Sequence, residues 1–264
     1  NNNINKLNNM KNIVWSMIVI GALVSCKKSS PSEETEGTLK VDEKNMSVVA
    51  KRTATWCGPC GDWGFTKFEG LEQEFSGKAV LMAWKDDFAT PAGTDLFDAV
   101  GPQFSLGTGV PTFFNNFQDS DGDSLIKQHN EGFVTANSNY ELDVKGQSVT
   151  LKTTTKFFTD VEGVYYLAPY MIVDGIVGYQ NGHPNSPNTE HHKYVAGIAK
   201  PVNVDDSENF GYQITSNGAR MGQTVNLDFT MKRDVTWDAN DISFGIVIFK
   251  QQSWGLQFVN AFTK

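Results

Sequence analysis

Cysteine and histidine are both scarce in this chain. Its 264 residues include only three cysteines and four histidines. A structural zinc site usually needs four such ligands, and no second cysteine pair stands beside Cys57 and Cys60. Zinc is therefore the less favoured alternative for this pair, and reversible disulfide chemistry is the expected one.

The chain also lacks an excess of positive charge. Lysine and arginine number 22 against 30 aspartate and glutamate residues, which gives a net charge of −8. A nucleic-acid-binding protein normally shows a basic patch, so nucleic acid is not an expected partner. We find no glycine-rich phosphate loop, no nucleotide fingerprint and no Ser-His-Asp order, and we expect no cofactor.

No apolar run near the start is long enough to cross a membrane. The apolar stretch at residues 13–24 has the length of a signal-peptide core instead. It ends in Leu-Val-Ser-Cys at Cys26, which resembles the lipobox of bacterial lipoproteins. The resemblance implies a signal peptide over residues 1–26 and a lipid on Cys26. An ordinary secretion signal with an incidental cysteine is the alternative. Residues 27–37 are charged, with Ser and Pro, and are expected to form a flexible tether.

The remaining two cysteines stand at an expected junction of strand and helix. Residues 47–54 are rich in Val and Thr and predict a strand. Residues 62–75 carry aromatic and leucine residues near helical spacing. Cys57 then lies where the strand turns into the helix, and a helix start favours a thiolate. A thiolate is the species that attacks a disulfide.

The motif Trp-Cys-Gly-Pro-Cys at residues 56–60 resembles the active-site signature of thioredoxin-like proteins. Val-Pro-Thr-Phe-Phe at residues 110–114 resembles the strand start of that family, which carries a cis proline facing the cysteines. The resemblance covers about residues 45–140. It implies that Cys57 is an exposed nucleophile and that Cys60 is the buried partner that resolves the mixed disulfide. It also implies a substrate groove lined by Trp56, Gly58, Pro59, Val110 and Pro111.

One position departs from the family pattern. The family usually carries a buried acid six positions before the first cysteine, and here that residue is Lys51. A lysine pointing inward would favour thiolate, but we expect it on an exposed strand edge. Asp86 and Asp87 are weak substitutes for the missing acid.

Two domains are expected. Alternating strands and helices predict a layered α/β sheet over residues 38–139, and the resemblance implies that this part is a thioredoxin-like domain. Its elements include a strand at 78–84, a helix at 94–104, a strand from 111, a turn between strands at 119–123 and a last helix at 131–139. The sequence of this turn resembles the start of a calcium-binding loop, but it lacks key residues of such a loop, so a turn is preferred.

An all-β antiparallel sandwich is expected over residues 140–264. Its pattern changes to period two, with turn signals between short runs. Strands are expected at 142–153 around a turn, and at 164–173, 195–198, 225–231, 242–249 and 256–262.

Residues 178–192 fit a plain sandwich poorly. They are rich in Asn and Pro and hold His183, His191 and His192. A metal site is one alternative, but neighbouring histidines on a strand point to opposite faces, so a loop packed on the neighbouring domain is favoured. The order of the thioredoxin-like half, the sandwich and this segment resembles the Omp28-related outer-membrane lipoproteins of Bacteroidetes-type bacteria. That resemblance implies placement in the cell envelope, on a membrane face that it leaves open.

Together these observations predict a lipid-anchored thiol–disulfide oxidoreductase outside the cytoplasm. Its expected partners are protein thiols or disulfides, an unidentified electron donor, and the membrane through its lipid anchor. A rival hypothesis is an outer-membrane or surface binding lipoprotein. In that hypothesis the thioredoxin-like half is a scaffold and the sandwich contacts protein or glycan.

Overall fold

The computed structural model describes residues 38–86, 88, 92–120, 122–202 and 210–264. The expected signal peptide, Cys26, the tether and Asp87 lie outside these residues. The elements in chain order are β1 (Ser47–Ala54), α1 (Gly58–Gly61), α2 (Trp63–Phe75), β2 (Ala79–Asp86), α3 (Ala92–Val100), the 3-10 helix η1 (Gly101–Phe104), β3 (Thr112–Asn115), α4 (Asp123–Asn130), β4 (Ala136–Lys145), β5 (Ser148–Phe157), β6 (Tyr165–Val173), β7 (Ile176–Gly178), β8 (Thr189–His191), β9 (Tyr194–Ile198), β10 (Lys200–Pro201), β11 (Tyr212–Thr215), β12 (Thr224–Lys232), the 3-10 helix η2 (Ala239–Asp241), β13 (Ile242–Gln252) and β14 (Gly255–Phe262).

The first strands place the cysteine motif. β1 pairs with β2 in parallel and with β3 antiparallel, so β1 is an interior strand. The alternation of side chains along β1 sends Val48 and Ala50 into one core and Val49 into another. Phe68 and Leu71 of α2 pack with Val49 on that second side. The strand–helix–strand order predicted for this stretch is confirmed.

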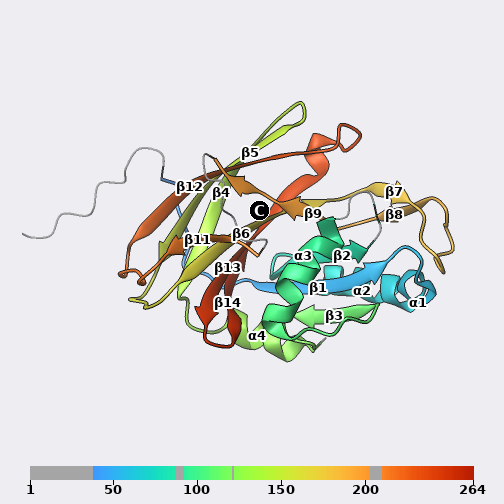
Figure 1. The fold of residues 1–264 in the computed structure, drawn as a ribbon. Coiled ribbons are helices and arrows are strands. Elements are labelled where there is room, and N and C mark those ends of the chain that lie inside the picture. Colours follow the sequence, from blue (N-terminus) through green and yellow to red (C-terminus); the bar gives the residue numbers. More distant parts are fainter. Residues whose placement is uncertain (1–37, 87, 89–91, 121, 203–209) are drawn as a thin grey trace, which may run out of the picture. The chain divides into compact units, whose positions relative to one another are not determined.

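The later strands form antiparallel layers. β14, β13, β6 and β9 continue the sheet of β2, β1 and β3, and β11 pairs with β6 (Figure 1). A second sheet runs β10-β12-β5-β4. A shared core lies between the sheets and includes Tyr140, Leu151, Phe229 and Phe244. The antiparallel strands predicted after residue 140 are therefore present.

A single sheet joins the two predicted halves. β2 meets β9 at the pair Ala83 and Tyr194. On one face of this sheet, Trp84 packs with Tyr170 in a core cluster that also contains Phe249. The described residues thus show one continuous mixed sheet, and two separate domains are not confirmed. The boundary at residues 139/140 stays a prediction.

Two expected features near residue 130 are wrong. Residues 131–139 were expected to be helical, but α4 ends at Asn130 and β4 begins at Ala136. The buried Asn45 side chain donates to the carbonyl oxygens of His129, Gly132 and Phe133. These hydrogen bonds stabilise a non-helical path after α4. The turn expected at residues 119–123 was placed between two strands, but the element that follows β3 is the helix α4. Within the described part of the chain, no helix combines the length and apolar character needed to span a bilayer.

Candidate functional site

The cysteine motif lies at the turn from β1 into α1. Cys57 is the N-cap residue of α1, and its Sγ accepts a hydrogen bond from the Cys60 N–H at 3.2 Å. The two cysteines form a disulfide with an S–S distance of 2.06 Å. α1 has only four residues, and α2 begins separately at Trp63 after Asp62. The strand-to-helix junction is as predicted, but the first helix is a single short turn.

Both sulfur-bearing residues are buried. Cys57 is 4% exposed and Cys60 is 1% exposed. The expectation that Cys57 is an exposed nucleophile is therefore wrong for this disulfide form. Segments distant in sequence cover the pair on two sides, which no pattern within residues 56–60 reveals.

The first covering segment is the start of β3. The peptide bond between Val110 and Pro111 is cis, as the resemblance implied. The Cys57 Sγ lies 3.6 Å from the carbonyl oxygen of Val110. The Pro111 ring packs against α2, since a Cβ on Gly64 would lie 3.0 Å from it. The structure thus brings Val110 and Pro111 to the cysteines, while Trp56 remains 59% exposed.

The second covering segment is the β7–β8 loop, residues 179–188. Its Asn181 donates from the backbone N–H to the Thr55 carbonyl at 2.8 Å and from Nδ2 to the Trp56 carbonyl at 2.9 Å. The loop backbone touches α1 closely enough that a Cβ on Gly61 would overlap the Asn181 carbonyl. The expectation of a loop packed on the first half of the chain is confirmed, and its target is the cysteine motif itself (Figure 1).

Lys51 is buried, so its expected place on an exposed strand edge is wrong. The residue is 6% exposed, because β1 is flanked by β2 and β3 and α2 covers this face. Its Nζ lies 4.4 Å from the ring centre of Phe68 and 5.0 Å from that of Phe65. Burial lowers the pKa of Lys51 to about 8, and the charges of Glu72 and Glu69 oppose that shift.

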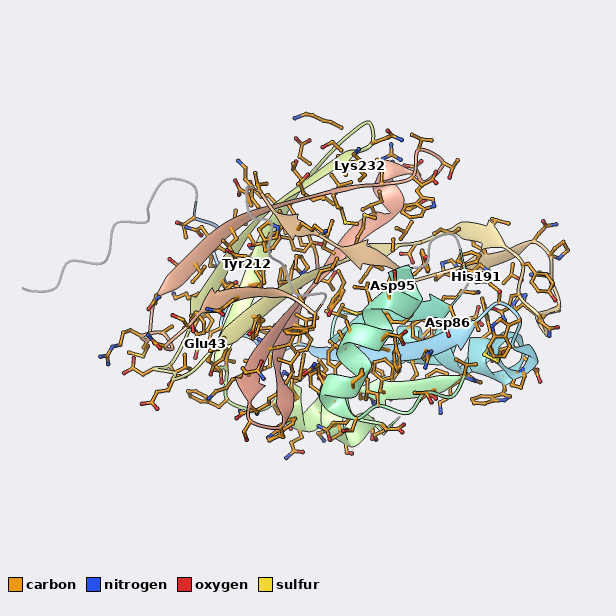
Figure 2. The ribbon with its side chains drawn as sticks, viewed as in Figure 1. Glu43, Asp86, Asp95, His191, Tyr212 and Lys232 are labelled. Carbon is orange, nitrogen blue, oxygen red and sulfur yellow. A yellow bond between two sulfur atoms is a disulfide. The ribbon has the colours of Figure 1, made fainter. Side chains whose placement is uncertain are left out.

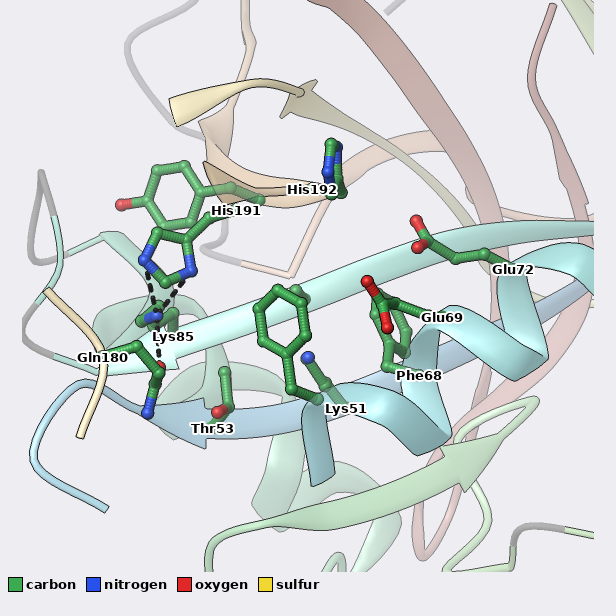
Figure 3. A pocket seen from close by; sticks show the side chains of 12 residues that line it. Lys51, Thr53, Phe68, Glu69, Glu72, Lys85, Gln180, His191 and His192 are labelled. Atoms are coloured by element: carbon green, nitrogen blue, oxygen red, sulfur yellow. Dashed lines mark hydrogen bonds between the residues drawn. The ribbon is translucent and has the colours of Figure 1, made fainter. Parts of the chain in front are cut away.

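A second buried lysine stands on the same face of the sheet. The Nζ of Lys85 donates to the Gln180 Oε1 at 2.6 Å and lies 2.8 Å from the His191 Nδ1 (Figure 3). Burial lowers the pKa of Lys85 to about 6, and the charge of Lys51 adds to the shift. Burial, followed by the charges of Lys85 and Lys51, lowers the pKa of His191 to about 3. His191 is therefore neutral at pH 7 and Lys85 is largely so.

These groups line a cavity of about 20 Å³ beside the motif. This volume is enough for about one water molecule. Lys51 and Lys85 face it from the sheet, while Glu69 and Glu72 of α2 border it on another side (Figure 3). Burial raises the pKa of Glu72. The cavity combines amines and carboxylates close to the cysteine turn, but it is too small for an organic substrate.

Asp86 does not replace the missing acid. It pairs with Arg52 at 3.2 Å, and Arg52 also donates to the Thr108 carbonyl at 2.8 Å. Arg52 and Asp86 alternate with Lys51 and Lys85 along their strands, so they lie on the opposite face of the sheet.

The three histidines of the loop region do not converge. His183 packs on Phe65 with ring centres 4.4 Å apart, and His192 lies 4.0 Å from Glu190. His191 is the last residue of β8 (Figure 2). Its ring faces Lys85 instead of the other two histidines. Among the described residues, no three His, Cys, Asp or Glu side chains gather as a metal site would require.

Sequence reasoning missed Lys85 and Gln180. Lys85 lies directly after the strand predicted at residues 78–84, but β2 extends to Asp86, so Lys85 takes the same face as Ala83. Gln180 carried no signal in the sequence, because its contact depends on the path of a long loop.

Comparison with known proteins finds similarity in fold only. No protein-family model matches the chain, and no curated protein does. HBP35 of Porphyromonas gingivalis has a similar structure, with a TM-score of 0.62 at 18% identity over 85% of this chain and 76% of that one. A domain of the outer membrane lipoprotein Omp28 from the same organism matches with a TM-score of 0.30 at 8% identity, over 50% of this chain and 88% of that one. The HBP35 likeness places this chain among mostly-sheet proteins of that fold, whereas the Omp28 superposition is too loose to carry an argument.

Proposed function

We propose that the protein is a thiol–disulfide oxidoreductase whose residues 38–139 form a thioredoxin-like unit. The observation that carries the proposal is the Cys57–Cys60 disulfide beside the cis Val110–Pro111 peptide, with the Val110 carbonyl 3.6 Å from the Cys57 Sγ. A carbonyl next to a cis proline at a half-buried strand start can pair with the backbone of an extended substrate. Trp56, Gly58 and Pro59 border the same place and complete the groove.

The reaction transfers two electrons from the dithiol to a protein disulfide. The Cys57 thiolate attacks one substrate sulfur, the substrate S–S bond breaks, and one substrate thiolate leaves. The Cys60 thiolate then attacks the Cys57 Sγ and releases the second substrate thiolate. Cys57 and Cys60 end as a disulfide, and a dithiol donor is needed to reduce them again. In the disulfide form Cys57 is 4% exposed, so the dithiol donor that reduces the pair must displace part of the two covering segments to reach it.

A reductase assay tests this function. The full chain, reduced beforehand, is mixed with a protein disulfide and the thiols released are counted. Wild type should release thiols in proportion to its reduced cysteine pair, and Cys57→Ser should release none. The Cys26→Ser variant is a matched control that removes a cysteine elsewhere and should reduce as wild type does. Wild type that behaves like Cys57→Ser would overturn the proposal.

We further propose placement in the cell envelope, with a lipid on Cys26 as the membrane anchor. The Leu-Val-Ser-Cys ending after an apolar core supports it. Outside the cytoplasm a disulfide such as Cys57–Cys60 persists until a donor reduces it.

A second candidate function is binding without redox chemistry. The burial of both cysteines supports it, as does a groove of about 410 Å³ elsewhere that Phe104, His129, Trp254 and Phe258 help to line. Trp254 is 66% exposed and offers a flat apolar face to a ligand. A wild-type protein that shows no reductase activity but binds a partner would favour this function.

A further inference from the structure

The side chain of Gln180 connects the buried lysine to the cysteine turn. Gln180 is 1% exposed, and it lies 123 residues after Cys57 in the sequence. Its Nε2 donates to the carbonyl oxygens of Ala54 at 3.1 Å and Cys57 at 3.2 Å. Its Oε1 accepts from the Lys85 Nζ at 2.6 Å.

The orientation of this amide follows from its partners. The carbonyls of Ala54 and Cys57 can only accept hydrogen bonds, so the nitrogen of the amide must face them. The oxygen must then face Lys85, whose amine has hydrogens to donate in either protonation state. Lys85 is held in turn by His191 at 2.8 Å. His191 therefore orients Lys85, Lys85 orients the Gln180 amide, and the amide holds the Cys57 carbonyl.

We propose that Gln180 is a positioning residue for the Cys57–Cys60 pair and that Lys85 acts on the pair through it. The proposal rests on the redox function proposed above. Gln180 aims the positive end of its amide dipole at the carbonyl of Cys57 and so at the turn that carries the attacking sulfur. Such a dipole favours negative charge on the Cys57 Sγ, and therefore the reduced form.

Other groups near the cysteine turn do not perform this role. Asn181 donates to the Thr55 and Trp56 carbonyls, which lie before the nucleophile, and its side chain is exposed. Lys51 lines the same cavity as Lys85, and its Nζ lies over the rings of Phe65 and Phe68. Gln180 is the described side chain that touches both the peptide of Cys57 and a buried amine.

The test measures the position of the dithiol–disulfide equilibrium in the full chain. Wild type, Gln180→Leu and Gln213→Leu are each equilibrated with glutathione buffers, and the reduced fraction is trapped and counted. Gln213 is an exposed residue of β11 and provides the same substitution away from the site. Gln180→Leu should shift the equilibrium toward the disulfide by about fivefold, the effect of one ordinary hydrogen bond. Gln213→Leu should leave it unchanged.

Lys85→Met provides the decisive comparison, because the Lys85 Nζ bonds to Gln180 and His191 and reaches the cysteine motif through Gln180. Alone it should shift the equilibrium in the same direction as Gln180→Leu. In the Gln180→Leu background it should have no further effect, since its route to the cysteines is gone. Equal equilibria for Gln180→Leu and Gln213→Leu would overturn the proposal, as would a Lys85→Met effect that persists without Gln180. If Gln180→Leu does not fold, an unchanged equilibrium in Lys85→Met alone overturns it.

Failure of the positioning role can be distinguished from failure of the proposed redox function. The glutathione equilibrium reports on the cysteine pair itself, whereas the reductase assay reports on protein substrates. Wild type without reductase activity but with a Gln180-dependent equilibrium would remove the function and keep the positioning role.

Discussion

Lys85 is an amine placed where its charged form is costly. It is 3% exposed and lies among neutral His191, the Gln180 amide and the charge of Lys51. Glu69 and Glu72 border the same cavity but on the side of α2. A group held this way makes stability depend on pH.

The sign of that dependence follows from the direction of the shift. The pKa of Lys85 falls from 10.5 to about 6, so between these values the unfolded chain binds more protons than the folded one. The free energy of unfolding should therefore rise with pH across this window, by at most about 1.4 kcal/mol per pH unit for one proton. Lys85→Met should raise stability near pH 6 and flatten the slope. Lys51, with a pKa of about 8, should leave a residual slope at higher pH.

Urea unfolding at pH 6, 7, 8 and 9 measures this prediction (about one pH unit per step resolves the slope). Lys127→Met, on the exposed side of α4, is the matched control and should keep the slope of wild type. Identical slopes in Lys85→Met and wild type would show that Lys85 does not titrate in this range.

The two cysteines should give opposite results when each is replaced. Cys57→Ser removes the attacking sulfur and should abolish disulfide reduction. Cys60→Ser leaves attack intact but removes resolution, so mixed disulfides between Cys57 and substrates should accumulate. Non-reducing gels followed by mass spectrometry detect them. Adducts in Cys57→Ser that are absent in Cys60→Ser would reverse the assigned roles.

At the scale of single residues, the cysteine pair and the cis proline could be predicted from the sequence, because both belong to local motifs. It did not locate Lys51 correctly. The position of a residue within a strand tells which face it takes, but only the pairing of β1 with both β2 and β3 tells that the strand is interior. Gln180 could not be predicted either, because its contacts depend on the path of the β7–β8 loop.

At the scale of elements, the β7–β8 loop is held against α1 by backbone contact. Gly61 is the residue that permits this approach, since any Cβ there would meet the Asn181 carbonyl. Gly61→Ala should therefore push the loop away and destabilise the protein by about 1–3 kcal/mol. In the reduced protein, Cys57 should then react faster with an alkylating reagent.

Gly70→Ala is the control for that substitution. Gly70 lies within α2 with open space around it, so alanine should stabilise the helix by about 0.5–1 kcal/mol. Its Cys57 alkylation rate should match wild type. An unchanged rate in Gly61→Ala as well would mean that the loop does not limit access to Cys57.

Element prediction succeeded where hydrophobic periodicity was strong and failed at junctions. β6, β12, β13 and β14 lie close to their expected ranges. The region after Asn130 failed because the side chain of Asn45, distant in sequence, binds the carbonyls that a helix would have used.

At the scale of the whole described chain, the shared sheet bears on the boundary at residue 140. A fragment that begins at Tyr140 would lose β2, whose Trp84 packs on Tyr170. It would also uncover Gly245, which lies against Val80 and Met82. We expect this fragment to show no cooperative unfolding transition, in contrast to a chain that begins at Thr38. A cooperative transition in the fragment, followed by circular dichroism, would establish an independent domain there.

Membrane attachment is a separate prediction for the full chain. If a lipid on Cys26 anchors the protein, Cys26→Ala should move it from the membrane fraction to the soluble fraction of the envelope. The reductase activity of the soluble form should stay unchanged, because Cys26 lies far in sequence from the motif. Mass spectrometry of the mature N-terminus checks the modification directly, and an unmodified terminus beyond Cys26 would exclude it.

The β7–β8 loop that covers the cysteine pair is synthesised much later than the pair itself. Gln180 follows Cys57 by 123 residues. At ribosomal rates of about 5–20 residues per second, the pair is made roughly 6–25 s before the residue that holds its turn. During that interval the loop does not yet cover the two thiols, so an oxidant that meets the chain before the loop folds can reach them. A newly made chain can thus acquire its disulfide before the loop arrives, whereas a folded, reduced chain must first displace the loop.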